Sequence, residues 1–400
     1  MSNIFSNRLF GNERLYVNQV LDSEFRGSKN QGFTSRLERT FAAKFNSNFA
    51  ISFINGTATM HSALEAYGIG VGDEVIVPAL TMSATTFAVL QANATPIFAD
   101  IDPNTFQISA TSIEKLITSK TKAIITVALY GLSPDMDSIM ELAKKFDLKV
   151  IEDNAECFLG EYKGKLVGSI GDCSSFSFQS TKHLTSGEGG ILLTKDHDFA
   201  DRVRKVQCLG YASVGASESR VTKKDIQNPN YSRHTTMGWN YRMPELCSAV
   251  ALAQLENIDH LVNRRIEVAS LFTEALDDCK WLIKQTTPKE CVHSYWTWVV
   301  KIARKDLSWQ TFRDKFISLG GDGIYAAWKL SYLEPMFVNL NLLGRESFIN
   351  PNVLKNYSAG LCPVAEELQP KLLQFKTSYW DLEQARIQAE ILRLTINYFS

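Results

Sequence analysis

The stretch Ser180-Thr-Lys-His-Leu-Thr-Ser-Gly187, followed by Glu188-Gly-Gly190, places Lys182 between a strand pattern and a glycine-rich turn. Residues 173–178 alternate small or polar side chains with aromatic ones, and an apolar run resumes at residue 191. This pattern predicts that the lysine lies on a tight connection between two strands. An amine in such a place can be partly desolvated, which favours the neutral nucleophile and imine formation with an aldehyde. A surface lysine beside a loop is the alternative, and the motif alone does not decide between them.

A second signal lies upstream, where the apolar run Leu148-Lys-Val-Ile-Glu-Asp153 predicts a buried strand that ends in carboxylates. Open α/β sheets bind their ligands at the carboxyl ends of such strands. Asp153 is therefore the candidate to face a pyridine nitrogen, because a carboxylate there keeps the nitrogen protonated and the ring an electron sink. An N-cap of a helix that includes Ala155 is an alternative of equal weight for Asp153.

The third signal is a strand-like run at residues 50–54 that leads into Asn55-Gly-Thr57 and then into a helical pattern. A helix N-terminus built from small residues presents free N–H groups and hydroxyls to an anion, so Gly56 and Thr57 form a candidate phosphate site. A plain helix cap has the same composition. The signal gains specificity only when it is combined with Asp153 and Lys182.

Together with further motifs, these three features resemble the DegT/DnrJ/EryC1/StrS family of sugar aminotransferases, which use pyridoxal phosphate. The resemblance is close over about residues 10–265 and follows by length and order beyond them. It implies an α/β, aspartate aminotransferase-like fold (pyridoxal-phosphate fold type I). A large cofactor-binding domain with a mainly parallel sheet is expected over residues 1–260, and a smaller α+β domain over residues 261–400. The matching stretches are Asn55-Gly-Thr-Ala-Thr59, Gly72-Asp-Glu-Val-Ile-Val-Pro78, Pro96-Ile-Phe-Ala-Asp-Ile-Asp102, Glu152-Asp-Asn-Ala155, Gly160-Glu-Tyr-Lys-Gly164, Phe176-Ser-Phe178, Gly187-Glu-Gly-Gly190 and Trp239-Asn-Tyr-Arg-Met243.

The resemblance also implies a role for each matching residue. Lys182 would hold pyridoxal 5'-phosphate as a Schiff base and then act as general base and acid. Asp153 would pair with the ring nitrogen of the cofactor. The phosphate would be bound by Gly56 and Thr57, with Ser177 adding a second hydroxyl.

Three further positions extend this implied cofactor site. Asn240 matches a family asparagine that reaches the phosphate of the partner subunit, so the resemblance implies a homodimer with shared active sites. Met82 stands where the family usually has an aromatic residue over the cofactor ring, and a thioether can still contact that ring. Glu156 stands where Gln or His commonly lies near the phenolic oxygen, and a carboxylate there repels a phenolate unless one group is protonated. Contact with the cofactor, contact with the substrate and exposure on a helix surface all remain open for Glu156.

The implied reaction moves an amino group, from glutamate by family expectation, to a keto-sugar. Lys182 favours transamination over the sugar dehydration of relatives that carry histidine at this position. A nucleotide-linked 3- or 4-keto-deoxyhexose is the family default for the acceptor. A keto-octulosonate, as used by the 8-amino-octulosonate transaminase of lipopolysaccharide synthesis, is a competitor. A regulatory protein that binds the cofactor without turnover is the alternative from another class.

Composition sets bounds on these interpretations. The chain has 400 residues, 45% of them hydrophobic, and a net charge of −1, which suits a large core. The near-neutral charge and the lack of a long basic run argue against nucleic-acid binding. We found no signal-peptide pattern and no run of about 18 apolar residues, so a cytoplasmic location without membrane contact is expected. The seven cysteines form no C-x-x-C pair, and no metal site is expected.

Strand-like runs alternate with helical patterns in the first half, which predicts a mainly parallel sheet covered by helices. Residues 244–256 open a helix that residues 259–275 continue, and this helix is expected to link the two domains. A strand at residues 296–302 and helices at residues 308–319 and 382–394 are predicted for the smaller domain. The strands predicted in the first half cover residues 74–77, 95–99, 123–127, 149–151, 175–178 and 191–194.

Two segments leave alternatives open. The polar, aperiodic residues 216–236 are either one wall of the substrate pocket or an insertion without function. The glycines and aromatic residues of 320–328 are either a structural turn or part of the pocket mouth.

Overall fold

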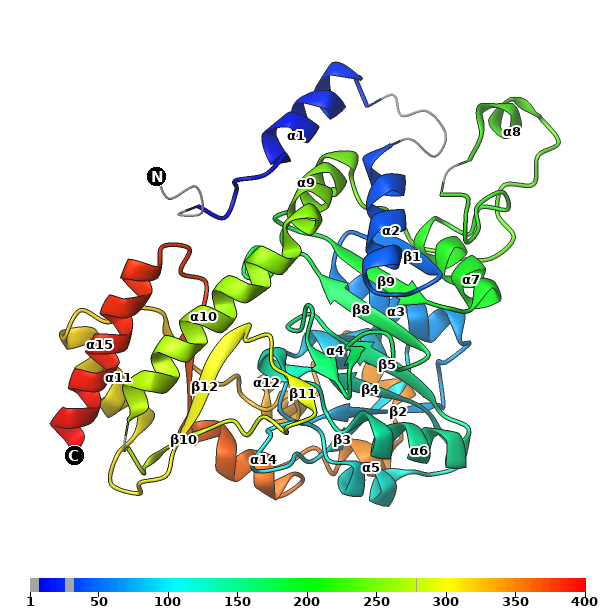
Figure 1. Cartoon of the computed structure of the whole chain (residues 1–400). Coiled ribbons are helices and arrows are strands. Elements are labelled where there is room, and N and C mark those ends of the chain that lie inside the picture. Colours follow the sequence, from blue (N-terminus) through cyan, green and yellow to red (C-terminus); the bar gives the residue numbers. More distant parts are fainter. Residues whose placement is uncertain (1–6, 26–31, 220, 278) are drawn as a thin grey trace.

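The computed structural model describes residues 7–25, 32–219, 221–277 and 279–400, and its centre is a seven-stranded sheet (Figure 1). One strand is antiparallel to both of its neighbours, and the remaining pairs are parallel. The prediction of a mainly parallel sheet is therefore confirmed. The antiparallel strand is the second in spatial order. In this order the strands are β1 (Phe49–Phe53), β9 (Gly190–Thr194), β8 (Cys173–Ser177), β5 (Lys149–Asp153), β4 (Thr121–Val127), β2 (Glu74–Pro78) and β3 (Thr95–Ala99).

Helices cover both faces of this sheet, which explains why most of its strands, although not β8, are nearly continuous apolar runs. In β2, Val75 and Val77 pack on one face, whereas Ile76 packs on the other. Because successive side chains alternate in this way, the strand contributes to two separate hydrophobic cores, one on each face of the sheet. The first face is covered by α3 (Gly56–Ala66), α4 (Ala84–Gln91) and α7 (His197–Gln207), and the second by α2 (Phe33–Lys44), α5 (Ala110–Leu116), α6 (Met136–Phe146) and α9 (Glu245–Glu256).

A second, four-stranded sheet is formed by the C-terminal part of the chain, and all of its strand pairs are antiparallel. Its strands in spatial order are β10 (Leu282–Lys284), β12 (Thr297–Ile302), β14 (Leu372–Lys376) and β13 (Ile324–Ala326). The helices that share a core with it are α10 (Ile258–Leu276), α11 (Trp309–Ser318) and α15 (Leu382–Phe399). The division into domains at residue 260 stays a prediction, although the change from one sheet to the other falls along α10.

The predicted continuous helix over residues 244–275 is interrupted at Asn257. There the backbone leaves the helical region, with φ −117° and ψ 15°. The side-chain amide of Asn257 donates to the carbonyl of Ala253 at 3.1 Å, while its backbone N–H donates to Gln254. Side-chain bonds to the preceding turn compete with helical bonds in this way. The result is two helices, α9 and α10, in place of one.

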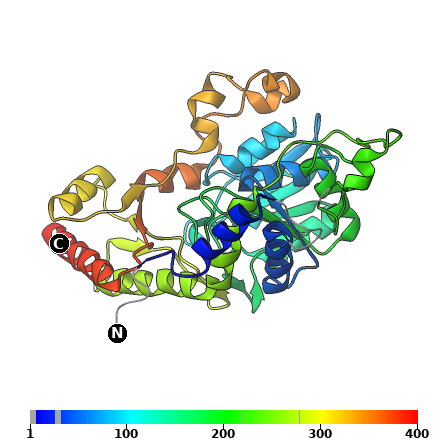
Figure 2. The ribbon, with the colours of Figure 1, turned by 90° about the horizontal axis from the view of Figure 1, so that it is seen from above.

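One segment of the C-terminal half returns to the edge of the large sheet, where Figure 2 shows it in orange. The hydroxyl of Tyr357 donates to the carbonyl of Pro96 in β3 at 2.5 Å. Asp100 accepts N–H groups of Val364 and Ala365, both at 2.9 Å. These bonds tie the C-terminal half to the large sheet. The segment contains η2 (Ser331–Leu333), α12 (Pro335–Val338), η3 (Arg345–Phe348), α13 (Pro351–Leu354), α14 (Pro363–Leu368) and η4 (Gln369–Lys371).

The remaining elements are short or peripheral. A small three-stranded sheet forms from β6 (Glu161–Tyr162), β7 (Lys165–Leu166) and β11 (Cys291–Val292). The other helical elements are α1 (Glu13–Asp22), η1 (Leu129–Gly131) and α8 (Lys223–Gln227). Within the described ranges, we find no helix with the length and apolar character needed to cross a membrane.

Candidate active site

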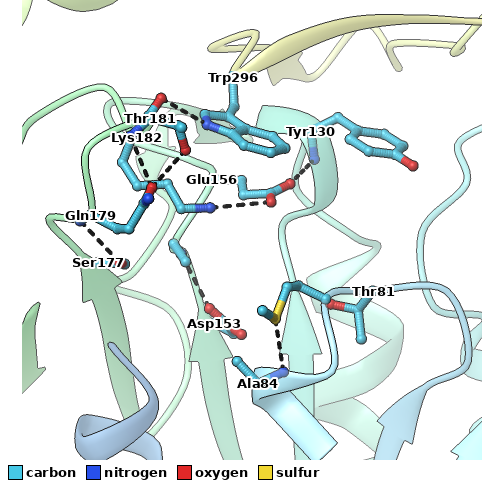
Figure 3. Close-up of polar contacts among 12 residues, drawn as sticks. Thr81, Ala84, Tyr130, Asp153, Glu156, Ser177, Gln179, Thr181, Lys182 and Trp296 are labelled. Carbon is cyan, nitrogen blue, oxygen red and sulfur yellow. Dashed lines mark hydrogen bonds and ion pairs between the residues drawn. The ribbon is translucent and has the colours of Figure 1, made fainter. Parts of the chain in front are cut away.

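The carboxyl ends of β4, β5 and β8 open into a cavity of about 840 Å³, which residues of the second sheet also line. This is the edge at which parallel α/β sheets bind ligands. The cavity brings together all but one of the predicted site residues, as Figure 3 shows in part. Those that line it are Gly56, Thr57, Met82, Asp153, Glu156, Ser177 and Lys182.

Lys182 lies in the loop between β8 and β9, as the sequence predicted. Its Nζ atom is 3.3 Å from Oε1 of Glu156 and 4.2 Å from the centre of the Trp296 ring (Figure 3). Only a small part of the lysine side chain is accessible, at 12%. The amine is therefore inside the cavity between a carboxyl group and an aromatic face, not on the surface.

Two arginines hold the backbone of the Lys182 loop. Arg265 on α10 donates to the carbonyls of Thr181 and Lys182 at 2.8 and 3.1 Å. Arg8 donates to the carbonyls of Lys182 and His183. Burial lowers the pKa of Arg265 to about 9 and that of Arg8 to about 10, so both remain cationic at neutral pH. The loop is thus fixed by charged donors that reach it from two distant parts of the chain.

Asp153 ends β5 and points into the cavity, whereas the neighbouring Glu152 points to the opposite face of the sheet. Thr85 donates its hydroxyl to Oδ2 of Asp153 at 2.8 Å, and the N–H of Ala155 lies 3.1 Å from Oδ1. Residues 155 and 156 form a turn and no helix begins after Asp153, so the helix-cap alternative for Asp153 is wrong. Burial raises the pKa of Asp153, against the opposing effect of the Thr85 hydrogen bond. A cationic ring nitrogen beside this carboxyl group would favour its ionised form.

Glu156 is fully inside the protein, so its predicted alternative as a charge on a helix surface is wrong. One carboxylate oxygen faces Lys182, and the other accepts the backbone N–H of Tyr130 at 3.0 Å (Figure 3). Burial raises the pKa of Glu156, while the Lys182 ammonium opposes that change. Contact with the cofactor and contact with the substrate remain the two alternatives.

The N-terminus of α3 forms the end of the cavity predicted to hold phosphate. Asn55 accepts the N–H of Ala58 at 2.8 Å, whereas the N–H groups of Gly56 and Thr57 have no partner among the residues that the structure describes. A Cβ atom added to Gly56 would lie 3.0 Å from the Cβ of Ser177, so glycine allows the helix to approach β8 closely. Free N–H groups and the hydroxyls of Thr57 and Ser177 are donors suited to an anion.

Met82 and Asn240 differ from the other predicted site residues because both are exposed. Met82 lies at the cavity but is 48% exposed, and its sulfur accepts the N–H of Ala84 at 3.0 Å. Asn240 is exposed and does not line the cavity of its own chain. The described residues of the segment 216–236 do not line it either. Four of them contribute instead to a separate cavity of about 470 Å³, namely Val221, Ile226, Tyr231 and Arg233.

The donor set fits pyridoxal 5'-phosphate at each end of the molecule. An amine enclosed by the protein can condense with the aldehyde, a buried carboxyl group can pair with the ring nitrogen, and a helix N-terminus with two hydroxyls can bind the phosphate. The glycine cradle at Gly56 supports the last of these, because a side chain there would press on Ser177.

Comparison with known proteins agrees with this geometry. The model of the DegT/DnrJ/EryC1/StrS aminotransferase family matches residues 9–338. The chain belongs to this family. It is 41% identical over 293 residues to the GDP-perosamine synthase of Escherichia coli O157:H7, which covers 73% of this chain and 76% of that protein. The GDP-perosamine synthase of Caulobacter vibrioides is 39% identical over 314 residues, or 78% and 79% of the two chains. The crystal structure of an aminotransferase from Psychrobacter cryohalolentis matches with a TM-score of 0.83 and 28% identity, covering 96% of both chains.

Family membership confirms the predicted aspartate aminotransferase-like fold and the cofactor, pyridoxal 5'-phosphate. The protein is a pyridoxal-phosphate-dependent sugar aminotransferase. Family membership also favours an enzyme over the alternative of a regulatory protein that binds the cofactor without turnover. The roles of the individual site residues remain proposals that rest on the geometry above.

Sequence reasoning missed several residues that surround Lys182 and Asp153. Thr85 lies three residues after Met82, in the first turn of α4. A hydroxyl near the start of a helix could have marked it as a candidate site residue. Trp296 and Arg265 gave no comparable signal, since they lie 115 and 84 residues from Thr181, whose carbonyl both of them contact. In 320–328 both alternatives hold. Gly320 and Gly323 have positive φ, as in a turn, and Tyr325 and Trp328 line the cavity.

Proposed function

We propose that the protein transfers an amino group from glutamate to a nucleotide-linked keto-deoxyhexose. The observation that carries the proposal is the enclosed amine of Lys182, which shares one cavity with the buried carboxyl group of Asp153. The relatives named GDP-perosamine synthase support a GDP-linked sugar as the acceptor. A keto-octulosonate is the second candidate acceptor, because no described residue of the cavity specifically favours it.

When bound, pyridoxal phosphate supplies an electron sink for the carbanion that forms beside its ring. The residues of this chain have separate tasks around it. Asp153 would hold the proton on the ring nitrogen. Lys182 would anchor the cofactor covalently, and its Nζ would then take a proton from one carbon and return it to another. Trp296 covers the amine and would exclude water from it.

Glu156 lies close enough to Lys182 to influence whether its amine is protonated. Its Oε1 lies 3.3 Å from Nζ, and its other oxygen is tied to the backbone of Tyr130. A carboxyl group fixed in this way can accept a proton from the amine or stabilise its charged form. We assign it this supporting role next to the cofactor.

The active site would be completed by a second subunit. A phosphate dianion needs more donors than a single helix end provides, and Asn240 does not reach the cavity of its own chain. We therefore propose a homodimer in which Asn240 contacts the phosphate bound by Gly56, Thr57 and Ser177 of the partner chain.

Incubation with pyridoxal phosphate, ¹⁵N-glutamate and either a GDP-linked 4-keto-6-deoxyhexose or a nucleotide-linked keto-octulosonate tests the proposal. We expect ¹⁵N in the GDP-linked sugar, detected by mass spectrometry. Transfer to the octulosonate alone would assign the acceptor to the second class. Transfer to neither, with the cofactor bound, would refute the proposed function.

A further inference from the structure

The second sheet closes the cavity with one face, and its residues alternate accordingly. In β14, Leu373 and Phe375 pack in the core between this sheet and its helices. Gln374 and Lys376 have the opposite parity and line the cavity. Successive side chains of a strand point to opposite faces, so these two side chains share the face that looks toward the large sheet. Thr297 of β12 pairs with Lys376 in the ladder and also lines the cavity.

Lys376 is a cation that the reaction at Lys182 does not use. Its Nζ lies 2.9 Å from Oδ2 of Asp322 and 4.4 Å from the centre of the Tyr379 ring. The side chain is 32% exposed and lines the cavity. Among the described residues, Lys376 and Lys182 are the two basic side chains that line this cavity.

Thr297 supplies a second and independent observation. The residue is only 6% exposed. Its hydroxyl is buried and has no hydrogen-bond partner within the part of the chain that the structure describes. Leaving a buried hydroxyl unpaired is costly, and native proteins pair nearly all such groups. Because Thr297 also lines the cavity, a ligand oxygen bound at this wall is a candidate partner for the hydroxyl.

The place of this pair relative to Lys182 follows from the chain. Trp296, which directly precedes Thr297, covers the amine of Lys182 at 4.2 Å. Trp296 precedes the first residue of β12, and both it and Thr297 line the cavity, so Thr297 is the direct neighbour of the residue that covers the amine. Trp328 stacks on Trp296, with ring centres 5.8 Å apart and planes at 26°, and adds an apolar wall beside it.

We propose that Lys376 and Thr297 form a subsite for an anionic oxygen group of a substrate. The group is a carboxylate of the amino donor or the phosphate linked to the sugar, which share the same recognition chemistry. Lys376 provides the charge and the Thr297 hydroxyl donates a hydrogen bond, while Asp322 and Tyr379 keep the ammonium in position. The inference rests on the proposed function, because it names the part of the substrate that this wall binds.

The test measures the two half-reactions separately in Lys376→Ala, Lys376→Arg and Thr297→Val. A charge-assisted hydrogen bond at a partly exposed site corresponds to about a tenfold change in affinity. We expect the half-saturation concentration of one substrate to rise about tenfold in Lys376→Ala, with little change in the limiting rate. Lys376→Arg should recover much of the loss. Lys371→Ala is the matched control, because Lys371 also pairs with a carboxylate at 2.9 Å, that of Glu367, but does not line the cavity.

A binding readout makes the result independent of turnover. Tryptophan fluorescence is titrated with inorganic pyrophosphate and with glutarate, since Trp296 and Trp328 lie in the cavity wall. Weaker glutarate binding and a donor effect in Lys376→Ala assign the carboxylate, whereas weaker pyrophosphate binding and an acceptor effect assign the phosphate. Half-saturation values and probe affinities all within twofold of wild type would overturn the subsite. If wild-type protein binds a probe through Lys376 but converts no donor, the proposed function fails while the anion subsite stands.

Discussion

Replacing Arg265 by Met is expected to loosen the loop that carries Lys182 without unfolding the protein. Arg265 is 1% exposed. Its guanidinium donates to the carbonyls of Thr181, Lys182 and Trp296 and to the hydroxyl of Thr377, over distances of 2.8 to 3.2 Å. It therefore joins the lysine loop of the large sheet to the strand that covers the cavity. Methionine has a similar length but no donor.

The expected loss in the free energy of unfolding depends on which other donors reach the same carbonyls. The indole N–H of Trp296 also donates to Thr181, at 3.0 Å, and Thr377 also donates to the carbonyl of Trp296, at 2.8 Å. Arg8 donates to the carbonyl of Lys182. Because the carbonyls of Thr181 and Lys182 keep these other donors, the variant chiefly loses charge-assisted bonds of about 1.5–3 kcal/mol each. Relief of the buried charge offsets part of this, and a net loss of about 2–4 kcal/mol in the free energy of unfolding is expected.

Activity is expected to fall more than this change in stability explains. Misplacement of a reacting group by about 1 Å can cost on the order of 100-fold in rate, so kcat should drop about 10- to 100-fold while the variant remains folded. Urea unfolding gives the stability, and half-reaction kinetics below the unfolding transition give the rate. Arg265→Lys should recover part of the rate because it keeps a cationic donor.

Arg304→Met is the matched control, since Arg304 pairs with Asp306 at 2.6 Å and does not line the cavity. Its kcat should equal that of wild type. Wild-type kcat in Arg265→Met, together with the expected loss of stability, would refute a positioning role and leave Arg265 as a purely structural residue.

Three further predictions concern the cofactor site. Lys182→Ala should abolish transamination in a folded protein, and borohydride reduction with peptide mapping should label Lys182 in wild type; label on another lysine would contradict the assignment. Asp153→Asn should retain the cofactor but lose most of the rate. Because burial raises the pKa of Asp153, its carboxylate destabilises the apoprotein as pH rises through the folded-state pKa, so the apo variant should be more stable than wild type at neutral pH. That advantage should shrink as pH falls toward the unfolded value of about 3.9, and urea unfolding at several pH values checks the sign. Mixing inactive Lys182→Ala chains with a crippling Asn240→Trp variant should restore activity in heterodimers, and tagged mixed dimers that stay inactive would refute the shared site.

The sequence predicted the large sheet and the residues at its carboxyl edge because these signals are local. A buried parallel strand shows as an apolar run, and Asp153 stands directly at the end of one. Lys182 lies in the connection between two such runs. The break at Asn257 was missed, since a single side-chain bond to the preceding turn interrupted an otherwise helical pattern.

The residues that surround the amine could not be predicted in the same way. Trp296 and Arg265 reach the lysine loop only through the packing of the second sheet and α10 against the large sheet. Their sequence neighbourhood is that of ordinary strand and helix residues. The burial of Glu156 is likewise decided by its contacts with Tyr130 and Lys182, so its local sequence left exposure open as an alternative.

This difference explains why the motifs identify the reaction more firmly than the acceptor. The groups to which we assign the chemistry, Asp153 and Lys182, lie on the large sheet, where they are fixed by a strand end and by a short loop. The opposite wall belongs to the second sheet, where Thr297 and Lys376 line the same cavity. A sugar acceptor must lie between the two walls while the reaction proceeds at the first. Substitutions on β12 and β14 can therefore change the substrate while Lys182 keeps its surroundings, provided that Arg265 still ties the lysine loop to the second sheet.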